Sequence, residues 1–314
     1  MVKRNALIMA VITTILWAGS YIVNKLAFQE GIGPLTLSGL RYLFASFILF
    51  FLGLGKKKKE NDPISPWMIV LLGLIGYALA QGVQYVGQSY LTPTQSSLFL
   101  SVGNTVLVML VDMIWLRENQ TRGDLVKLFI LIAGISLYYY PWDAGAFSAA
   151  GLLFMLASSV GYALNITINR RLLTTKRIDT RALVAQPMFV GAVILLMAGL
   201  FVEGVPVITL RLVLILLYLS GISGALGFYL WTKSQSVLTA FESSSINNLL
   251  LIEIAIMDYL AFQRSFSPIQ IIAILIVFTA VVWIQRRSKA TNDAAGGTKD
   301  DSTGRSRKMA TKAG

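Results

Sequence analysis

The 314-residue sequence contains no cysteine and no histidine. The absence of cysteine excludes a disulfide framework and a thiolate nucleophile, and the absence of both residues excludes zinc sites of the usual kind. A serine–histidine pair for nucleophilic catalysis is excluded for the same reason. Any side chain that carries protons in this protein must therefore be a carboxylate.

Common enzyme motifs are missing as well. The Gly-x-Ser-x-Gly turn of a serine hydrolase does not occur, and the segment Gly53-Leu54-Gly55 lacks the Gly-x4-Gly-Lys-Ser/Thr spacing of a phosphate-binding loop. We therefore expect neither an enzyme nor ATP-driven chemistry, and no cofactor or metal site.

Charged residues are scarce, at 13% of the chain, whereas 55% is hydrophobic and the mean hydropathy is +0.68. A soluble core of this size could not hide so much apolar surface, so the sequence predicts a protein that lives in a lipid bilayer. In a soluble protein the formal net charge of +12 would suggest nucleic acid. In a membrane protein the positions of the basic residues along the chain indicate topology instead, and we expect no nucleic-acid partner.

Ten apolar runs are long enough to span the hydrocarbon layer of about 30 Å, and their spacing is too long for the strands of a barrel. They lie at about 6–28, 35–54, 67–90, 94–116, 125–142, 149–169, 182–202, 210–232, 239–262 and 267–285. Only helices satisfy their own backbone groups in lipid. The sequence therefore predicts an all-α integral membrane protein with ten transmembrane helices, the first of which is retained and is not a signal peptide.

The first helix contains a motif that returns 145 residues later. Trp17, Asn24 and Lys25 correspond to Tyr162, Asn169 and Arg170. Further pairs at the same offset are Gly76 and Gly221, Ala80 and Ala225, Gly82 and Gly227, Ser89 and Ser234, and Thr94 and Thr239. A repeat of this length indicates an ancient duplication, which underlies many transporter folds, although a duplicated scaffold without a transport role would show it too.

The basic residues predict the orientation. With the N-terminus inside, 23 of the 27 Lys and Arg residues fall on cytoplasmic stretches. The run Lys56 to Lys59 would also suit anionic lipid, but we interpret it as a topology anchor. Five helices per repeat then invert the second half relative to the first. We expect a first five-helix repeat at 1–142, a second at 143–287 and a disordered cytoplasmic tail at 288–314, in a plasma or inner membrane.

Polar residues within the spans are candidates for a solute path, because each needs a partner or a wet cavity. Gln81, Gln84, Tyr85 and Gln88 share one face of the third helix, and Tyr162 and Asn165 oppose them in the sixth. Such groups suit a neutral or zwitterionic organic solute. They would also serve as hydrogen bonds between helices, although for the glutamine stripe we favour the cavity.

Charges within the spans have two interpretations each. Lys25 and Arg41 either snorkel or pair with a substrate carboxylate. Glu242 and Glu253 lie eleven residues apart on one helix face. They are proton-coupling candidates or, alternatively, partners of Arg41 or Lys233. Two further sets have simpler interpretations: Asp112 and Asp258 as interfacial residues, and Gly73, Gly76, Ala80, Gly221, Gly224 and Gly227 as points of close helix approach.

Together these features resemble the drug/metabolite transporter superfamily, specifically its EamA branch. The resemblance rests on the ten helices in two repeats, Trp17-x6-Asn24-Lys25, Arg41, and the Trp-Leu-Arg-Glu at 115–118, and it covers roughly residues 5–287. It implies an inner-membrane secondary transporter that exports amino acids and other small metabolites along a path between the halves. The sequence departs from the family pattern at Gln263-Arg264, where Gly-Glu is usual, and lacks the carboxylate that four-helix relatives use in the first helix for drug/proton antiport.

We therefore expect a transporter that exports an amino acid or related small polar metabolite by alternating access. The expected central site comprises Trp17, Ser20, Tyr21, Asn24, Tyr162 and Asn165, with Gln81, Gln84, Tyr85 and Gln88 along the path. One alternative is an anionic solute such as a sugar phosphate, with Lys25, Arg41 and Lys233 as charge partners. Another is a membrane receptor or scaffold without turnover. The sequence makes no prediction of the oligomeric state.

Overall fold

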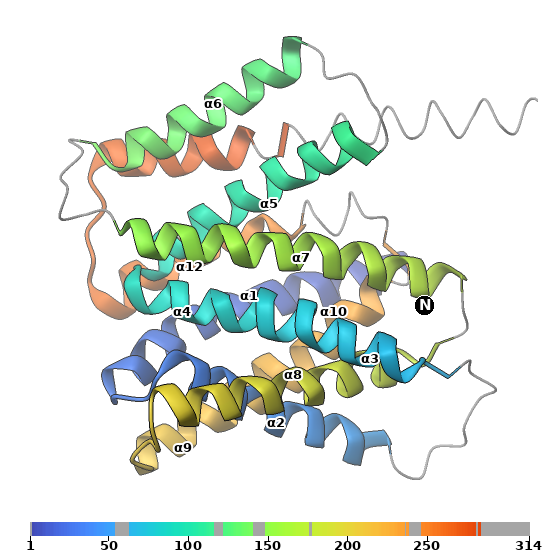
Figure 1. Ribbon diagram of the computed structural model, residues 1–314. Helices are drawn as coiled ribbons and strands as arrows, with labels where there is room; N and C mark the ends of the chain where they lie inside the picture. The colour runs from blue at the N-terminus through green and yellow to red at the C-terminus, as the bar shows by residue number, and fades with distance from the viewer. Residues whose placement is uncertain are drawn as a thin grey trace, which may run out of the picture.

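The protein is described from a computed structural model, in which residues 2–53, 63–115, 122–140, 148–175, 178–235, 237–238, 246–280 and 282–283 are placed. Those residues form helices and connecting turns, and none of them forms a strand (Figure 1). The predictions for Lys56 to Lys59, Glu118, Glu242 and the tail from residue 288 lie outside the described residues.

The helices of the first half are α1 (Lys3–Gln29), α2 (Pro34–Gly53), α3 (Pro66–Leu72), η1 (Gly73–Gly82), α4 (Val83–Tyr90), α5 (Pro93–Trp115) and α6 (Arg122–Tyr138). Those of the second half are α7 (Ala149–Thr175), α8 (Thr180–Val202), α9 (Leu210–Leu217), η3 (Tyr218–Leu226), α10 (Gly227–Gln235), α12 (Leu249–Phe262) and an unlabelled helix at Pro268–Ala280.

Each of the ten predicted spans contains helix within its described residues, and the fold is an all-α membrane protein of two five-helix repeats. The segments α3, η1 and α4 together make the third span, and α9, η3 and α10 make the eighth. Five spans are both long and apolar enough to cross a membrane by length and composition alone, and others are shorter. The sixth helix runs to Thr175 instead of 169, because residues 170–175 include no proline or glycine. Of the predicted ninth span, residues 239–245 lie outside the described part.

Local sequence explains several helix ends. Ser65 accepts a hydrogen bond from the Met68 amide ahead of Pro66, and Thr209 does the same for Leu212, as capping residues do. At the other ends, Gly31 after α1 and Gly204 after α8 have φ of 83° and 81°. Such left-handed conformations favour glycine, so both turns are encoded by the sequence.

The third and eighth spans each contain a π-helical segment, which the sequence did not predict. η1 begins at Gly73 and η3 begins at Tyr218, which is again an offset of 145 residues. π-helical turns are rare and frequently occur at functional sites. The duplication therefore preserved an unusual backbone geometry as well as helix number.

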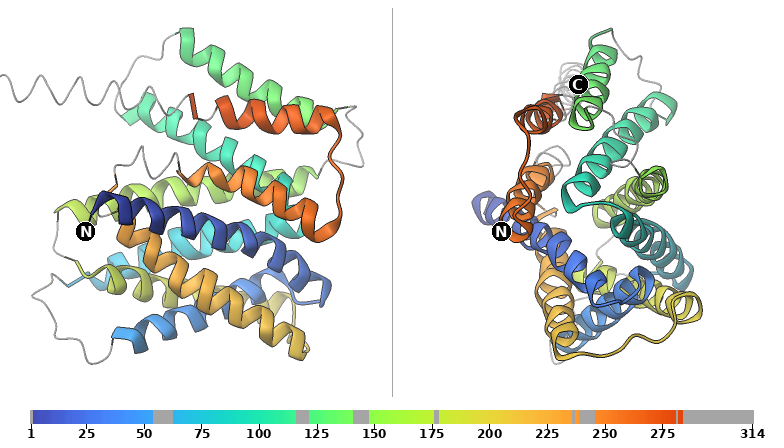
Figure 2. Two further views of the ribbon diagram at one scale, coloured as in Figure 1. Left: turned by 180° about the vertical axis from the view of Figure 1, so that it is seen from behind. Right: turned by 90° about the vertical axis from the view of Figure 1, so that its left-hand side faces the viewer.

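The two halves pack around an approximate two-fold axis. α1 and α7, the first helices of the halves, run in opposite directions (Figures 1 and 2). α2 packs on α8; α1 packs on α10 and α12, as α7 does on α4 and α5. One apolar cluster joins α2, η1, α8 and η3, and a second joins α5, α6, α12 and the Pro268–Ala280 helix.

Small residues allow the closest helix contacts. A Cβ at Gly39 would lie 2.6 Å from the Leu196 nitrogen, and one at Gly199 would lie 2.5 Å from the Thr36 nitrogen. Both contacts join α2 to α8, so these glycines hold the halves together. The predicted role of Gly221 in close approach is wrong, because the nearest atom to its added Cβ is 4.0 Å away, which is ordinary contact.

Candidate functional site

Buried polar side chains gather where α1, α2, η1, α4, α7 and η3 meet. We call this group the central polar cluster; its members are Tyr21, Asn24, Arg41, Tyr42, Gln81, Gln84, Tyr85, Gln88, Tyr162 and Ser223. Nine of them are classed as buried, and Tyr162 is half-buried. Buried polar groups in a membrane protein face the bundle interior and mark candidate solute paths.

Gln84 joins the two halves within this cluster. Its Nε2 donates to the Tyr21 hydroxyl at 2.6 Å, and its Oε1 accepts from the Tyr162 hydroxyl. Tyr21 lies on α1 and Tyr162 on α7, the first helices of the two repeats. One amide therefore touches both halves, and relative motion of α1 and α7 must rearrange its hydrogen bonds.

Asn24 and Gln88 form a second amide contact, one helical turn further along α4. The Asn24 Nδ2 donates to Gln88 Oε1 at 2.8 Å. The remaining Asn24 Oδ1 and Gln88 Nε2 are buried and have no hydrogen-bond partner among the described residues. Each of these two bonded side chains therefore keeps one buried, unpaired polar atom, an acceptor on Asn24 and a donor on Gln88, at a substantial cost unless something else satisfies them.

Arg41 is the charged member of the cluster and is only 3% exposed. Its guanidinium donates to the Tyr85 hydroxyl and, at 2.8 Å, to Ser223 Oγ of η3. The guanidinium carbon also lies 5.2 Å and 5.7 Å from the ring centroids of Tyr42 and Tyr85. Arg41 is therefore held in place by tyrosines of its own half and a serine of the other, and it does not snorkel.

The predicted site residues fall into two groups. The structure brings together Tyr21, Asn24, Gln81, Gln84, Tyr85, Gln88 and Tyr162, as described above, with Gln81 accepting from Tyr42 at 2.7 Å. Trp17, Ser20 and Asn165 lie at the margin of the cluster. The Trp17 indole donates to the Ser223 carbonyl, Ser20 bonds within its own helix, and Asn165 accepts from Asn169.

The predicted charges outside the cluster lie apart from it. Glu253 accepts from Thr14 at 3.1 Å, and its Oε2 has no partner among the described residues. Thr14 precedes Asn24 by ten residues, which is about 15 Å along α1. Lys25 donates to the carbonyl oxygens of Ser89 and Leu91, beyond the end of the amide stripe.

Asp258 was interpreted from the sequence as interfacial because it lies toward a helix end, but it is not exposed. Its side chain is 0% exposed and accepts from the amide and the hydroxyl of Thr94. Thr94 lies in the first turn of α5, where backbone N–H groups have no helical partners. Asp258 therefore joins α12 to the start of α5, and a position near a helix end did not imply exposure.

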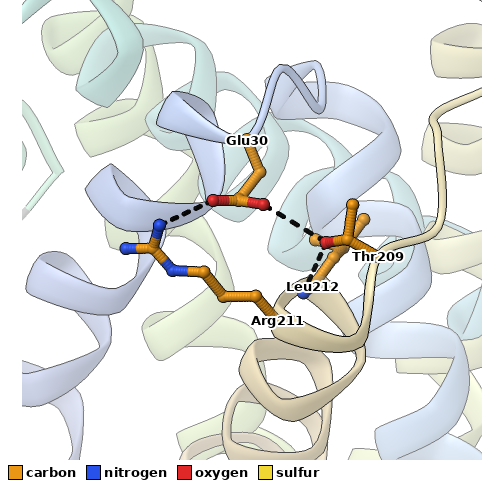
Figure 3. A network of polar contacts seen from close by, with 4 residues as sticks. All are labelled: Glu30, Thr209, Arg211 and Leu212. Carbon is orange, nitrogen blue, oxygen red and sulfur yellow. Dashed lines mark hydrogen bonds and ion pairs between the residues drawn. The ribbon is translucent and has the colours of Figure 1, made fainter.

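One end of the molecule is tied by two glutamates, Glu30 and Glu203, which the sequence assigns to short outer loops; it did not predict their contacts. Glu30 lies between Thr209 and Arg211 and contacts both, with an ion pair of 2.7 Å to Arg211 (Figure 3). Glu203 accepts from the amides of Leu35 and Thr36, each at 2.8 Å, at the start of α2. Each half thus supplies one carboxylate that binds the other half, and we call this pair of contacts the glutamate latch.

Sequence reasoning also missed Tyr42 and Ser223. Tyr42 directly follows Arg41 in the sequence. An aromatic residue next to a cation within an apolar span could have predicted this cation–π contact. Ser223 had no such signal, because the π-helical segment and the packing of η3 on α2 bring it to Arg41.

Two apolar hollows lie elsewhere. One of about 320 Å³ is lined by Ile130, Leu275 and Trp283, among others, and another of about 350 Å³ by Val102, Leu107 and Leu156. Neither of these two hollows includes a residue of the central polar cluster.

The sequence matches the EamA-like transporter family over residues 4–140 and 149–286. It is 26% identical to the uncharacterized transporter YvbV of Bacillus subtilis over 303 residues, covering 93% of this chain and 95% of the relative. A S-adenosylmethionine/S-adenosylhomocysteine transporter of Chlamydia trachomatis is 24% identical over 177 residues, covering 53% of this chain and 54% of the relative.

A solved crystal structure shares the fold, with a TM-score of 0.64. It covers 90% of this chain and 98% of its own chain at 16% identity. At that level of identity the likeness concerns the arrangement of helices alone.

Proposed function

The chain belongs to the EamA-like transporter family and is a multi-pass membrane transporter, and on this premise we propose that it exports amino acids or related small polar metabolites by alternating access. We also propose that the protein lies in a plasma or inner membrane with both termini in the cytoplasm, as the distribution of basic residues favours. The moving units are the repeats at 1–142 and 143–287.

One observation carries the proposal. The amide of Gln84 bonds α1 of one half and α7 of the other, and beside it Asn24 and Gln88 retain an unpaired acceptor and donor. Hydrogen-bonding groups at the interface of two inverted repeats are where secondary transporters bind their solutes. A small solute with both donors and acceptors would satisfy the two unpaired amide atoms.

Coupling to protons is assigned to Glu253. It has one hydroxyl partner and an unpaired oxygen, and it lies within the α1–α12 contact. Since the chain has no histidine, a carboxylate is the side chain available for this role. Glu242 is the second residue that we propose for this role.

The proposal is tested by uptake of a labelled panel into proteoliposomes that contain the purified protein, with and without an imposed pH gradient. The panel comprises the twenty amino acids and S-adenosylhomocysteine. Accumulation that requires the gradient in the wild type, and equilibration without accumulation in Glu253→Gln, would support coupled transport. Binding without movement of any member would favour a receptor or scaffold and would contradict the proposal.

A second candidate function is carriage of an anion such as a sugar phosphate. It is favoured by Arg41, a buried cation within the central polar cluster. Strong competition by phosphate esters, together with weak competition by free amino acids, would establish it in place of the first.

A further inference from the structure

The charge of Arg41 has no counter-ion among the residues that the structure describes. The described acidic side chains in the folded helices and their connections each have another partner: Glu30 bonds Arg211, Glu203 bonds the start of α2, Glu253 bonds Thr14, Asp258 bonds Thr94, and Asp179 caps α8. Arg41 lies two turns into an apolar helix, where an unpaired charge is costly. A residue kept there at such a cost is a candidate for function.

The contacts of Arg41 are all neutral, and they fix its orientation. Tyr85 and Ser223 accept from its two terminal nitrogens, while Tyr42 and Tyr85 cover its plane. Its Nε has no partner among the described residues. A guanidinium has five N–H groups, and the two contacts use one on each terminal nitrogen, so three remain: the Nε–H and one N–H on each terminal nitrogen. The Nε–H and an N–H of a neighbouring terminal nitrogen can together match the two oxygens of a carboxylate.

The neighbouring amides complete a pattern. Gln88, which accepts from Asn24, follows Tyr85, which accepts from Arg41, by three residues on α4, or about 5 Å along the helix axis. The unpaired Asn24 Oδ1 is an acceptor and suits an ammonium group. A carboxylate site and an ammonium site one turn apart fit the two charged groups of an α-amino acid.

We propose that Arg41 binds the carboxylate of the transported solute and so restricts the substrates to compounds with one free carboxylate, an α-amino acid in the first instance. The inference rests on the proposed function, whose substrate class it names. The Chlamydia relative is a transporter of S-adenosylmethionine and S-adenosylhomocysteine. Both compounds contain an α-amino acid group.

A phosphate ester fits the site less well, because Arg41 is alone. Lys25 is bonded to the Ser89 and Leu91 carbonyls at one end of α1. Lys233 lies in the last turn of α10, in the segment that packs against Ala6 and Ala10 at the other end of α1. The three cations therefore do not converge, and one guanidinium balances one negative charge.

The test uses Arg41→Met and Arg41→Lys, with Arg181→Met as the matched control. Arg181 donates to the Leu52 carbonyl at the end of the bundle. Its substitution therefore removes an arginine that is not part of the central polar cluster. Transport of the amino-acid panel is measured for each variant in proteoliposomes. Each transported amino acid is then set against its α-carboxamide, which keeps the ammonium and removes the carboxylate, as a competitor.

We expect Arg41→Met to weaken apparent affinity about 10- to 100-fold, the effect of losing a hydrogen bond to a charged group. Arg41→Lys should retain part of the affinity, because a point charge cannot form the paired contact. The α-carboxamide should compete poorly with the wild type. A carboxamide that competes as well as the free acid would overturn the inference.

Thermal unfolding of the same proteins separates binding from a structural role. Removing a buried charge without a counter-ion should leave the unfolding temperature of Arg41→Met equal to or above that of the wild type. A clear decrease, with transport lost in proportion to folded protein, would make Arg41 a structural residue.

Failure of the proposed function can be told apart from failure of the carboxylate site at Arg41. If the wild type moves no panel member, the proposed function fails. The carboxylate site is then tested separately, by comparing thermal unfolding in added sodium acetate, lactate or benzoate with unfolding in sodium chloride. Stabilisation of the wild type but not of Arg41→Met would keep the carboxylate site. No difference between the salts would overturn it.

Discussion

Arg41 and Gln186 occupy equivalent positions in the two halves, 145 residues apart, and so do Gln81 and Leu226. Both halves contain a π-helical segment that begins at the same offset. The side chains differ: the first half supplies the guanidinium and the three glutamines of the central polar cluster, and the second supplies Tyr162 and Ser223. The comparison teaches that the duplication preserved the helix arrangement in both halves, whereas most of the candidate binding side chains now come from the first half.

The largest effect is expected from moving the charge between the halves. Arg41→Gln should weaken apparent substrate affinity about 10- to 100-fold, since it removes a charged hydrogen-bond donor. Adding Gln186→Arg should not restore transport, because Pro187 stands where Tyr42 covers Arg41 and Leu230 where Tyr85 accepts from it. Uptake by the single and double variants measures this, and recovery in the double variant would show that the halves are interchangeable.

The next effect concerns the frame itself. Gly199→Ala should lower the free energy of unfolding by about 1 to 3 kcal/mol, because the new methyl group meets the α2 backbone. Gly221→Ala is the matched control, since its nearest neighbour is 4.0 Å away. Unfolding of both purified variants in detergent is the measurement. Equal stability would mean that the α2–α8 contact tolerates separation.

A smaller effect is expected at the amide that joins the halves. Gln84→Ala removes two neutral hydrogen bonds and should weaken substrate binding about tenfold, with normal expression. Its counterpart at the same offset is Tyr229, which packs against the α2–α8 cluster. Tyr229→Phe keeps the ring and should change transport less than about twofold. Unchanged kinetics in Gln84→Ala would remove Gln84 from the site.

The smallest effect is expected at the glutamate latch. Glu203→Gln weakens a charged contact with the start of α2, a change of about 1 kcal/mol. Glu30→Gln should cost less, because its partner Arg211 is 58% exposed and such pairs contribute little. Thermal unfolding of the two variants gives the order. A larger loss for Glu30→Gln would reverse the assignment of the stronger contact.

The sequence placed the helices well because span length is set by the bilayer and apolar runs show it directly. It also found most of the cluster, since amides such as Gln84 and Gln88 stand out in apolar helices. It could not pair them: that Gln84 meets both Tyr21 and Tyr162, or that Ser223 meets Arg41, depends on how helices cross. The π-helical segments also change which side chains face the neighbouring helices. The small residues in these segments do not by themselves predict a π-helix.

The absence of cysteine makes one direct measurement simple, because a single introduced cysteine is the only thiol in the protein. Ser223→Cys places a thiol beside Arg41, and Ser267→Cys places one in an exposed connection as a control. The labelling rate of each by a small thiol reagent is followed with and without a transported amino acid. The account predicts that the amino acid slows labelling at position 223 and leaves 267 unchanged, whereas its α-carboxamide slows neither. Equal labelling of position 223 with and without the amino acid would contradict a binding site at Arg41.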